Sequence, residues 1–254
     1  MNLKVKPRHL INIARNCWDL KDQVKDLLWE LKDARLMAEY SKWIMKKRWR
    51  EAEEFIVQSG SAAIYYANLV LKRPWPDAEQ EMIKEAAGFD LLNYAVNIKK
   101  NRWPEAEHRF ADNFYSVIRY GNLALQKSFL EPFKEVVFAA QSPSSTFYLC
   151  KNFIHKRCDR SERIILKCPK HCVYYAKEII KGRWPEAEEV IQTDPSASVD
   201  YACDVMKARW HEGEVKLYRH DNQDYWETYI KHFGGGLHGE KYFLETNPLL
   251  KDKP

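Results

Sequence analysis

One hexapeptide, Arg-Trp-Pro-Glu-Ala-Glu, occurs twice in this chain, at residues 102–107 and 183–188. Weaker copies surround three further tryptophans, so the related segments are centred on Trp49, Trp75, Trp103, Trp184 and Trp210. Their spacings are 26, 28, 81 and 26 residues, and the gap of 81 corresponds to three periods of about 27. Phe129 and Cys158 occupy the two missing anchor positions. A fixed period of this length is the signature of stacked supersecondary units.

A second marker keeps the same phase. A tyrosine precedes the anchor by nine residues in six units, at Tyr40, Tyr66, Tyr94, Tyr120, Tyr175 and Tyr201. Tyr148 precedes Cys158 by ten residues, and Tyr229 continues the series although no tryptophan follows it. Four of the tyrosines are followed by a small residue that lets another helix approach closely, namely Ala67, Ala95, Ala176 and Ala202. Two markers in phase indicate about seven repeats.

The segment from 172 to 191 predicts the structure of one repeat. Its first half has apolar residues at i, i+4, i+7 and i+8, one face of a helix, at Cys172, Ala176, Ile179 and Ile180. We expect Gly182 to end this helix and Pro185 to start the next, where a missing N–H costs nothing. Glu186 then stands in the first turn, which favours the helix dipole. The second apolar stripe consists of Ala187, Val190 and Ile191.

Such short helices are marginal alone in water and need neighbours to bury their stripes. The sequence therefore predicts an all-α fold, an α-solenoid of about seven stacked helix-turn-helix repeats of 26–28 residues with a cap at each end. We expect basic capping helices over 1–37, the repeats over 38–233, and a glycine-rich loop and tail over 234–254. The tryptophan of each repeat is expected to wedge between successive turns.

The pattern Tyr-Ala-x-x-Val-Ile-x-Gly-Arg-Trp-Pro-Glu-Ala-Glu resembles repeats in uncharacterised proteins of tailed bacteriophages and prophages. Its residues here are Tyr175, Ala176, Ile179, Ile180 and 182–188, with counterparts around Trp103 and Trp210. The resemblance covers roughly residues 38–215. It implies a phage origin and a helical repeat fold, and it implies no activity.

The sequence favours a cytoplasmic protein, and the resemblance implies that the cytoplasm is that of a bacterial host. No apolar run approaches the ~18 residues that a membrane span needs. The N-terminus lacks the pattern of a signal peptide, and the six cysteines are therefore expected to be reduced thiols. We expect no membrane partner.

Lysine and arginine residues precede every anchor. We name this set the basic edge: Lys47, Arg48, Arg73, Lys100, Arg102, Lys156, Arg157, Lys181, Arg183, Lys207 and Arg209. Stacked repeats would align these residues, and residues 1–50 add a net charge of +7, so the edge is a candidate for binding nucleic acid. The favoured alternative is structural, because acidic residues follow the anchors, as at Glu53, Glu79, Glu107, Glu188 and Glu214. Each arginine is then expected to pair with one of them.

Two other groups of residues are weaker candidates. Cys150, His155, Cys158, Cys168, His171 and Cys172 form a cysteine and histidine cluster. Their spacings fit no usual zinc finger, Cys150 takes the position of Cys203 in a regular repeat, and Cys158 replaces a tryptophan, so we expect buried thiols and no metal. In the glycine-rich segment, Glu240 stands where a phosphate loop needs lysine.

The remaining histidines have no nucleophile or carboxylate at a telling spacing, so we expect no enzyme, no cofactor and no small-molecule substrate. The sequence favours a protein-binding scaffold, since helical repeats present extended binding surfaces. For a phage protein the expected partner is a host or phage protein, such as a defence effector, a toxin or a transcription factor. The alternative is a nucleic-acid-binding protein that uses the basic edge.

Overall fold

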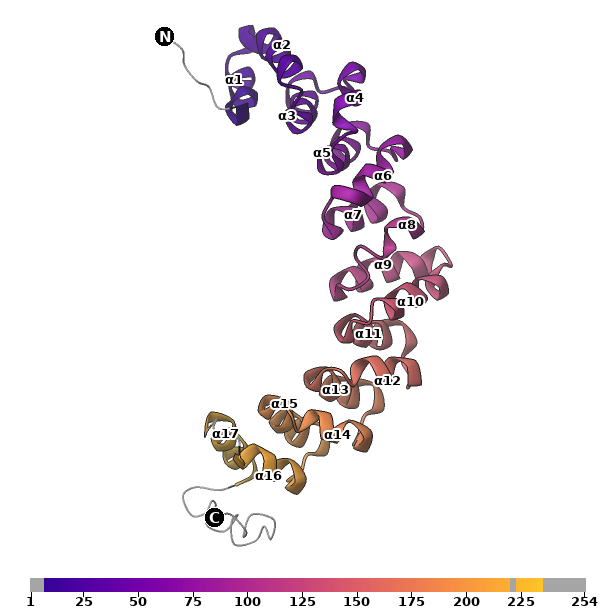
Figure 1. Ribbon diagram of the computed structural model, residues 1–254, viewed down its shortest axis with the longest axis vertical. Helices are drawn as coiled ribbons and strands as arrows, with labels where there is room; N and C mark the ends of the chain where they lie inside the picture. Colours follow the sequence, from indigo (N-terminus) through magenta and orange to yellow (C-terminus); the bar gives the residue numbers. More distant parts are fainter. Residues whose placement is uncertain (1–6, 220–222, 235–254) are drawn as a thin grey trace. The chain divides into compact units, whose positions relative to one another are not determined.

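The computed structural model describes residues 7–219 and 223–234, and all regular structure in these residues is helical (Figure 1). The chain divides into two compact units. The N-terminal unit comprises 1–111 and 119–136, and the C-terminal unit comprises 112–118 and 137–254. The all-helical fold predicted from the sequence is confirmed, whereas a continuous solenoid stays a prediction. None of the described helices combines the length and the apolar character that crossing a bilayer requires.

The N-terminal unit begins with two capping helices and continues with three helical hairpins. Its elements are η1 (Pro7–His9), α1 (Leu10–Asn16), η2 (Trp18–Leu20), α2 (Lys21–Leu31), α3 (Ala34–Tyr40), η3 (Ser41–Met45), η4 (Arg50–Ala52), α4 (Glu53–Ile56), α5 (Gly60–Tyr66), η5 (Ala67–Leu71), α6 (Pro76–Glu85), α7 (Gly88–Tyr94), η6 (Ala95–Lys99) and α8 (Pro104–Glu107). Helices α9 (Phe114–Gln126) and α10 (Leu130–Ala139) contribute residues to both units.

The C-terminal unit contains further hairpins of the same design. Its elements are α11 (Pro143–Leu149), η7 (Cys150–Ile154), α12 (Asp159–Ile165), α13 (Pro169–Tyr175), η8 (Ala176–Ile180), α14 (Pro185–Ile191), α15 (Pro195–Asp200), η9 (Tyr201–Met206), α16 (His211–Arg219) and α17 (Gln223–Phe233).

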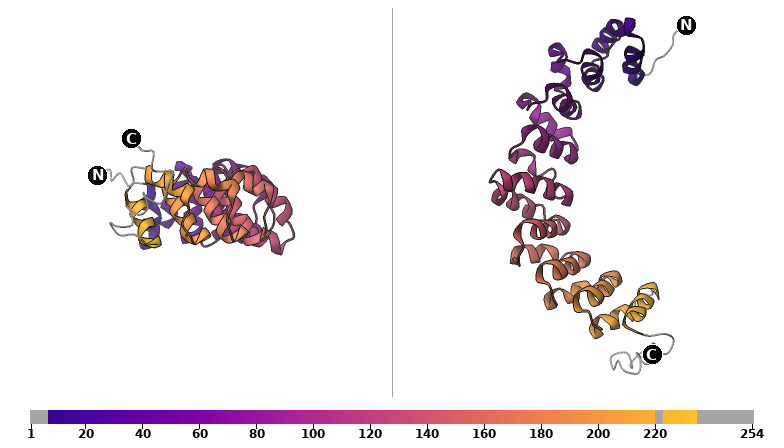
Figure 2. Two further views of the ribbon diagram at one scale, coloured as in Figure 1. Left: turned by 90° about the horizontal axis from the view of Figure 1, so that it is seen from below. Right: turned by 180° about the vertical axis from the view of Figure 1, so that it is seen from behind.

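Within each unit the hairpins stack in two layers. Helix α3 packs against α5 and α5 against α7, while in the other unit α11, α13, α15 and α17 follow one another in the same way. The second helices, such as α4 and α6 or α12 and α14, form the other layer, and the views from front and back agree on this (Figures 1 and 2). Each helix thereby buries a stripe that it could not bury alone.

The first helix of a hairpin ends in a π-helical turn followed by one left-handed residue. In the second hairpin the N–H of Lys72 donates to the carbonyl of Ala67, five residues back, at 2.8 Å. Residues with φ between 51° and 59° end this turn in six hairpins, at Lys46, Lys72, Lys100, His155, Lys181 and Lys207. The expectation for Gly182 was therefore wrong, because Lys181 adopts the left-handed conformation in its place. Proline does begin the second helix, as predicted for Pro185.

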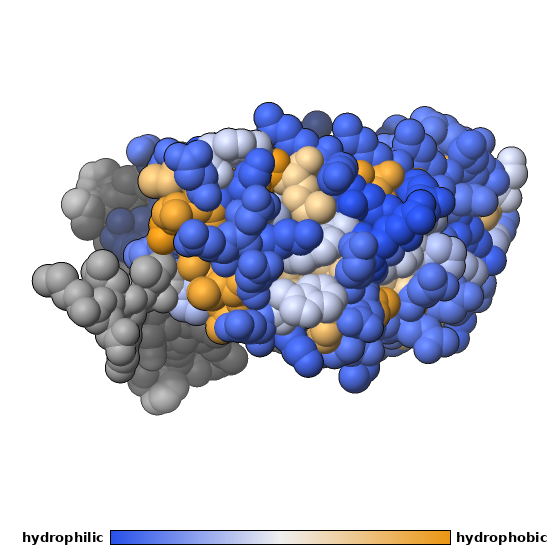
Figure 3. Space-filling model, turned by 90° about the horizontal axis from the view of Figure 1, so that it is seen from above, coloured by the Kyte–Doolittle hydropathy of each residue, from blue (hydrophilic) through white to orange (hydrophobic). Residues whose placement is uncertain are grey.

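Helices α1 and α2 lie in the segment that was expected to cap the repeats, and this segment leaves apolar residues exposed. Helix α2 buries Val24 and Leu28, while its Leu27 and Leu31 and the preceding Leu20 of η2 are exposed. Figure 3, which views the molecule from this end, shows hydrophobic side chains among hydrophilic ones. The predicted C-terminal loop and tail lie outside the described residues apart from Gly234.

The anchors and the tyrosines form the centre of the hairpin stack. All five anchor tryptophans are buried, and each tyrosine ring packs on the anchor of its own hairpin, with centroids 5.0 Å apart for Tyr201 and Trp210. Tyr148 is the exception, because Leu149 is the buried residue nine positions before Cys158. Tyr148 instead stacks on Phe114, with centroids 4.7 Å apart. The marker at Tyr148 was therefore assigned one residue too early.

Candidate functional site

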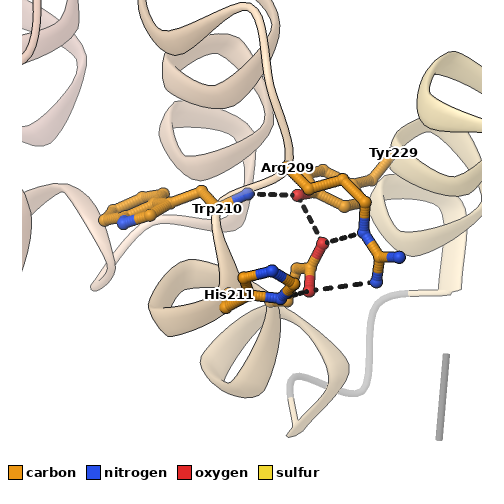
Figure 4. Close-up of polar contacts among 5 residues, drawn as sticks. Arg209, Trp210, His211 and Tyr229 are labelled. Carbon is orange, nitrogen blue, oxygen red and sulfur yellow. Dashed lines mark hydrogen bonds and ion pairs between the residues drawn. The ribbon is translucent and has the colours of Figure 1, made fainter. Parts of the chain in front are cut away.

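A hydrogen-bonded network at the turn of most hairpins uses five of the eleven residues of the predicted basic edge. In the last hairpin the backbone N–H of Trp210 donates to the hydroxyl of Tyr229 at 2.8 Å (Figure 4). That hydroxyl donates to Oε1 of Glu214 at 2.7 Å, and Glu214 is buried. Arg209 holds the same carboxylate with two nitrogens at 2.8 and 3.3 Å. His211 Nδ1 lies 3.1 Å from its other oxygen.

This tyrosine network recurs along the chain and always joins consecutive hairpins, since the tyrosine belongs to the next one. Four further copies of the network are present. Each is given in the order arginine, anchor, glutamate and tyrosine: Arg48, Trp49, Glu53 and Tyr66; Arg102, Trp103, Glu107 and Tyr120; Arg157, Cys158, Glu162 and Tyr175; and Arg183, Trp184, Glu188 and Tyr201. The repeated hexapeptide thus encodes a link between neighbours.

In the hairpin anchored at Trp75, a lysine takes the place of the arginine that pairs with the glutamate. Pro74 occupies the position directly before the anchor that arginine holds in the neighbouring hairpins, and Arg73 stands one residue earlier. Lys99 of the next hairpin binds Glu79 instead, at 2.7 Å. Arg73 is exposed, and within the described residues it has no ion pair.

The hairpin anchored at Phe129 lacks the network, and there the two units meet in the sequence. Phe133 stands at the glutamate position, four residues after the anchor, and Leu149 stands at the tyrosine position of the following hairpin. The N–H of Phe129 is satisfied within its own hairpin by the carbonyl of Ala124, at 2.9 Å. Because both polar partners are replaced together, neither leaves an unsatisfied buried group.

The pKa values of the tyrosine and of the arginine in the network are both raised. Burial raises the pKa of Tyr201 well above its ordinary 10.0, and the nearby carboxylate of Glu188 raises it further. The hydrogen bond to Glu188 raises the pKa of Arg183. The phenol is therefore neutral and the guanidinium charged, and both are held by hydrogen bonds to Glu188.

The favoured reading of the arginines is confirmed for Arg48, Arg102, Arg157, Arg183 and Arg209, since each pairs with a glutamate five residues later. The lysines of the basic edge differ from them. Lys47, Lys100, Lys156, Lys181 and Lys207 are exposed, and none has an ion pair among the residues that the structure describes. What remains of the basic edge for a ligand is thus mainly lysine.

Together with three further lysines, Lys47 of this set lines a cavity that the sequence did not reveal. The lysine pocket, of about 420 Å³, lies between the π-helical turns η3 and η5 of the N-terminal unit. Its lining consists of Ser41, Lys42, Trp43, Lys46, Lys47, Leu69, Val70 and Lys72. Only Lys47 belongs to the basic edge as predicted. Trp43 was the available signal, because it is a tryptophan out of phase with the anchors.

The pocket adjoins an exposed face on the first helices of the N-terminal unit. We name this aromatic face by Trp43, Tyr65, Leu69 and Phe89, which lie on three consecutive hairpins. Trp43, Leu69 and Phe89 are 45%, 36% and 56% exposed. The indole N–H of Trp43 donates to the hydroxyl of Tyr65 at 3.0 Å, and the guanidinium of Arg35 lies 3.9 Å from the centre of the Tyr65 ring. These contacts fix the orientation of the rings.

The first helices of the C-terminal unit present a more charged face. Lys177 pairs with Asp204 of the next hairpin at 2.9 Å, and Lys151 pairs with Glu178 at 3.4 Å. Glu178 and Asp204 hold the register positions that Trp43 and Leu69 hold in the N-terminal unit, three residues after the repeat tyrosine. Ion pairs between neighbouring hairpins are typical of a solvated face.

The cysteine and histidine cluster is dispersed. Cys150 and Cys172 are buried, and burial raises the pKa of the Cys172 thiol to about 12. Cys150 takes the position of Ala202, one residue away from the position of Cys203 that was expected. His171 lies 3.1 Å from the sulfur of Cys168, while His155 is the exposed left-handed residue of its turn. Among the described residues no three His, Cys, Asp or Glu side chains are grouped to hold a metal.

No protein-family model matches the chain, and comparisons with curated proteins and with solved structures find no significant match. The resemblance to bacteriophage repeats therefore stays a prediction.

Proposed function

We propose that this protein is a non-enzymatic scaffold that binds another protein through the aromatic face of its N-terminal unit. The observation that carries the proposal is the exposure of Trp43, Leu69 and Phe89 on three consecutive hairpins. Aromatic residues are enriched at the centres of protein interfaces, and contiguous exposed apolar residues mark such sites. The repeat fold supplies the rigid support, since the tyrosine network links each of these hairpins to the next.

The partner is expected to be a host or phage protein in the bacterial cytoplasm, for example a defence effector, a toxin or a transcription factor whose activity the scaffold inhibits. The support for this step is the resemblance of the repeat to phage sequences. The absence of a catalytic role is also part of the proposal. It is supported by the hydrogen bonds that engage the glutamates and tyrosines of the repeat with one another.

A pull-down from bacterial lysate tests this function. Tagged wild-type protein, the double variant Trp43→Ala/Phe89→Ala and the control Tyr174→Ala are compared after nuclease treatment. Tyr174 is an equally exposed aromatic residue on a first helix of the C-terminal unit. We expect one stoichiometric protein with the wild type and the control, and its loss with the double variant. Equal capture by all three proteins, or capture of no protein, would contradict the proposal.

Nucleic-acid binding is the second candidate, because exposed lysines recur at the turns of both units. Phosphate contacts release counterions, so such binding falls by orders of magnitude between ~50 and ~200 mM salt. Titration of labelled duplex and single-stranded DNA over this range distinguishes the two functions. Capture of many proteins that disappear after nuclease treatment would also favour this second candidate.

A further inference from the structure

The lysine pocket combines a cluster of positive charge with an apolar wall. Four of its eight lining residues are lysines, Lys42, Lys46, Lys47 and Lys72, and no lining residue is acidic. The volume of about 420 Å³ falls within the ~300–1,000 Å³ of ordinary ligand pockets. A ligand that enters it gains from negative charge, because the lysines have no ion pair among the described residues.

The backbone fixes where two of these charges stand. Lys46 and Lys72 both have φ of 53° and directly follow the turns η3 and η5. A residue with a side chain pays roughly 1–2 kcal/mol in this conformation, which glycine avoids. The same left-handed lysine recurs at Lys100, Lys181 and Lys207, and at η3 and η5 two such residues line one pocket.

The remaining wall is suited to a hydrophobic side chain. Trp43, Leu69 and Val70 contribute it, and the polar atom of the indole is already engaged by Tyr65. The guanidinium of Arg15 lies 5.3 Å from the centre of the Trp43 ring, and the remaining exposed surface of the ring can make apolar and stacking contacts. A purely ionic ligand would leave this wall uncovered.

We propose that the lysine pocket binds a short acidic segment of the partner protein, with glutamate or aspartate side chains on the four lysines and one hydrophobic side chain against Trp43 and Leu69. This inference rests on the proposed function and names the chemistry of the segment that the aromatic face receives. It favours a peptide over nucleic acid for two reasons. The arginines of the basic edge, whose fork geometry suits phosphate, are paired with glutamates except Arg73, and the apolar wall matches a side chain such as leucine.

The test uses a short fluorescent peptide rich in glutamate with one leucine, titrated by fluorescence anisotropy against the full chain. Two comparison ligands are the same peptide with glutamine in place of glutamate and a single-stranded oligothymidylate. We expect binding of the acidic peptide only. Lys46→Glu/Lys72→Glu is expected to weaken it at least tenfold, or about 1.4 kcal/mol.

The matched control is Lys181→Glu/Lys207→Glu, which reverses the same charges at the same left-handed position in the C-terminal unit. It is expected to change the affinity less than twofold. Lys47→Glu lies outside the left-handed position and serves as a second test if the first variant loses its helical circular dichroism. Equal losses in both units, preference for the oligothymidylate, or no binding of the peptide would each overturn the proposal.

The pull-down distinguishes failure of the lysine-pocket proposal from failure of the proposed scaffold function. A partner that is lost with Trp43→Ala/Phe89→Ala but retained with Lys46→Glu/Lys72→Glu would overturn the lysine pocket and leave the scaffold function standing. Failure of the wild type to capture any protein would overturn the function itself.

Discussion

At the scale of single residues, the tyrosine of each repeat joins two hairpins. The ring of Tyr201 packs on Trp210 of its own hairpin. Its hydroxyl accepts a hydrogen bond from the backbone N–H of Trp184, in the preceding hairpin, at 2.6 Å. The same hydroxyl donates to Glu188 at 3.1 Å. A buried hydroxyl that serves as donor and acceptor at once leaves two groups unsatisfied when it is removed.

We therefore expect Tyr201→Phe to lower the free energy of unfolding by about 1–3 kcal/mol, because the N–H of Trp184 and the carboxylate of Glu188 each lose a partner. Urea denaturation followed by circular dichroism measures the change. Tyr174→Phe is the control, since Tyr174 is exposed, and it is expected to cost less than about 0.5 kcal/mol. Equal effects of the two substitutions would show that the network contributes nothing to stability.

At the scale of the elements, the turn between the two helices of a hairpin is defined by a π-helical turn and a left-handed residue. Lys207 has φ of 53° and follows η9, and Lys181 has φ of 59° and follows η8. In the hairpins that have this turn, the left-handed residue follows the tyrosine position by six residues. Helix α9, which ends at Gln126, has no such turn, and its left-handed residue, Ser128, comes later relative to Tyr120.

Glycine at the left-handed position is expected to stabilise the chain, because it relieves the clash of the side chain with the backbone. Lys207→Gly should raise the free energy of unfolding by about 0.5–1 kcal/mol, the strain relieved less the entropy that glycine loses. Lys216→Gly, in helix α16 of the same hairpin, should lower it by about 1 kcal/mol. Thermal and urea unfolding of both variants measures these opposite signs, and destabilisation by Lys207→Gly would contradict the strain argument.

At the scale of the whole molecule, the network repeats within each unit and is missing at the hairpin of Phe129, where the chain passes from one unit to the other. The pKa values of the tyrosine hydroxyls in the network are all raised. Burial raises the pKa of Tyr66, Tyr94, Tyr120, Tyr175, Tyr201 and Tyr229 above the ordinary 10.0. The folded chain therefore binds these protons more tightly than the unfolded chain does.

It follows that the stability linked to these protons is fully present below about pH 10 and is lost as the pH rises from there towards the folded pKa values. We expect the melting temperature to fall steeply above about pH 10, with tyrosinate absorbance of the buried rings appearing together with unfolding. Alkaline melts recorded by circular dichroism and tyrosinate absorbance test this. Ionisation of all tyrosines near pH 10 in a chain that stays folded would contradict it.

The sequence by itself determined the repeat, because the tryptophan and tyrosine markers are local and recur in phase. It also predicted the Arg–Glu pairing, since a cation before the anchor and an acid after it, as in Arg183 and Glu188, lie on one turn. Tertiary structure decided the rest. Only the packing shows that Tyr229 accepts the hydrogen bond from the N–H of Trp210 and that Lys99 pairs with Glu79 in place of an arginine. It also shows that Leu149 takes the position assigned to Tyr148. The lysine pocket was likewise invisible, because it joins residues from two hairpins whose apposition no local pattern encodes.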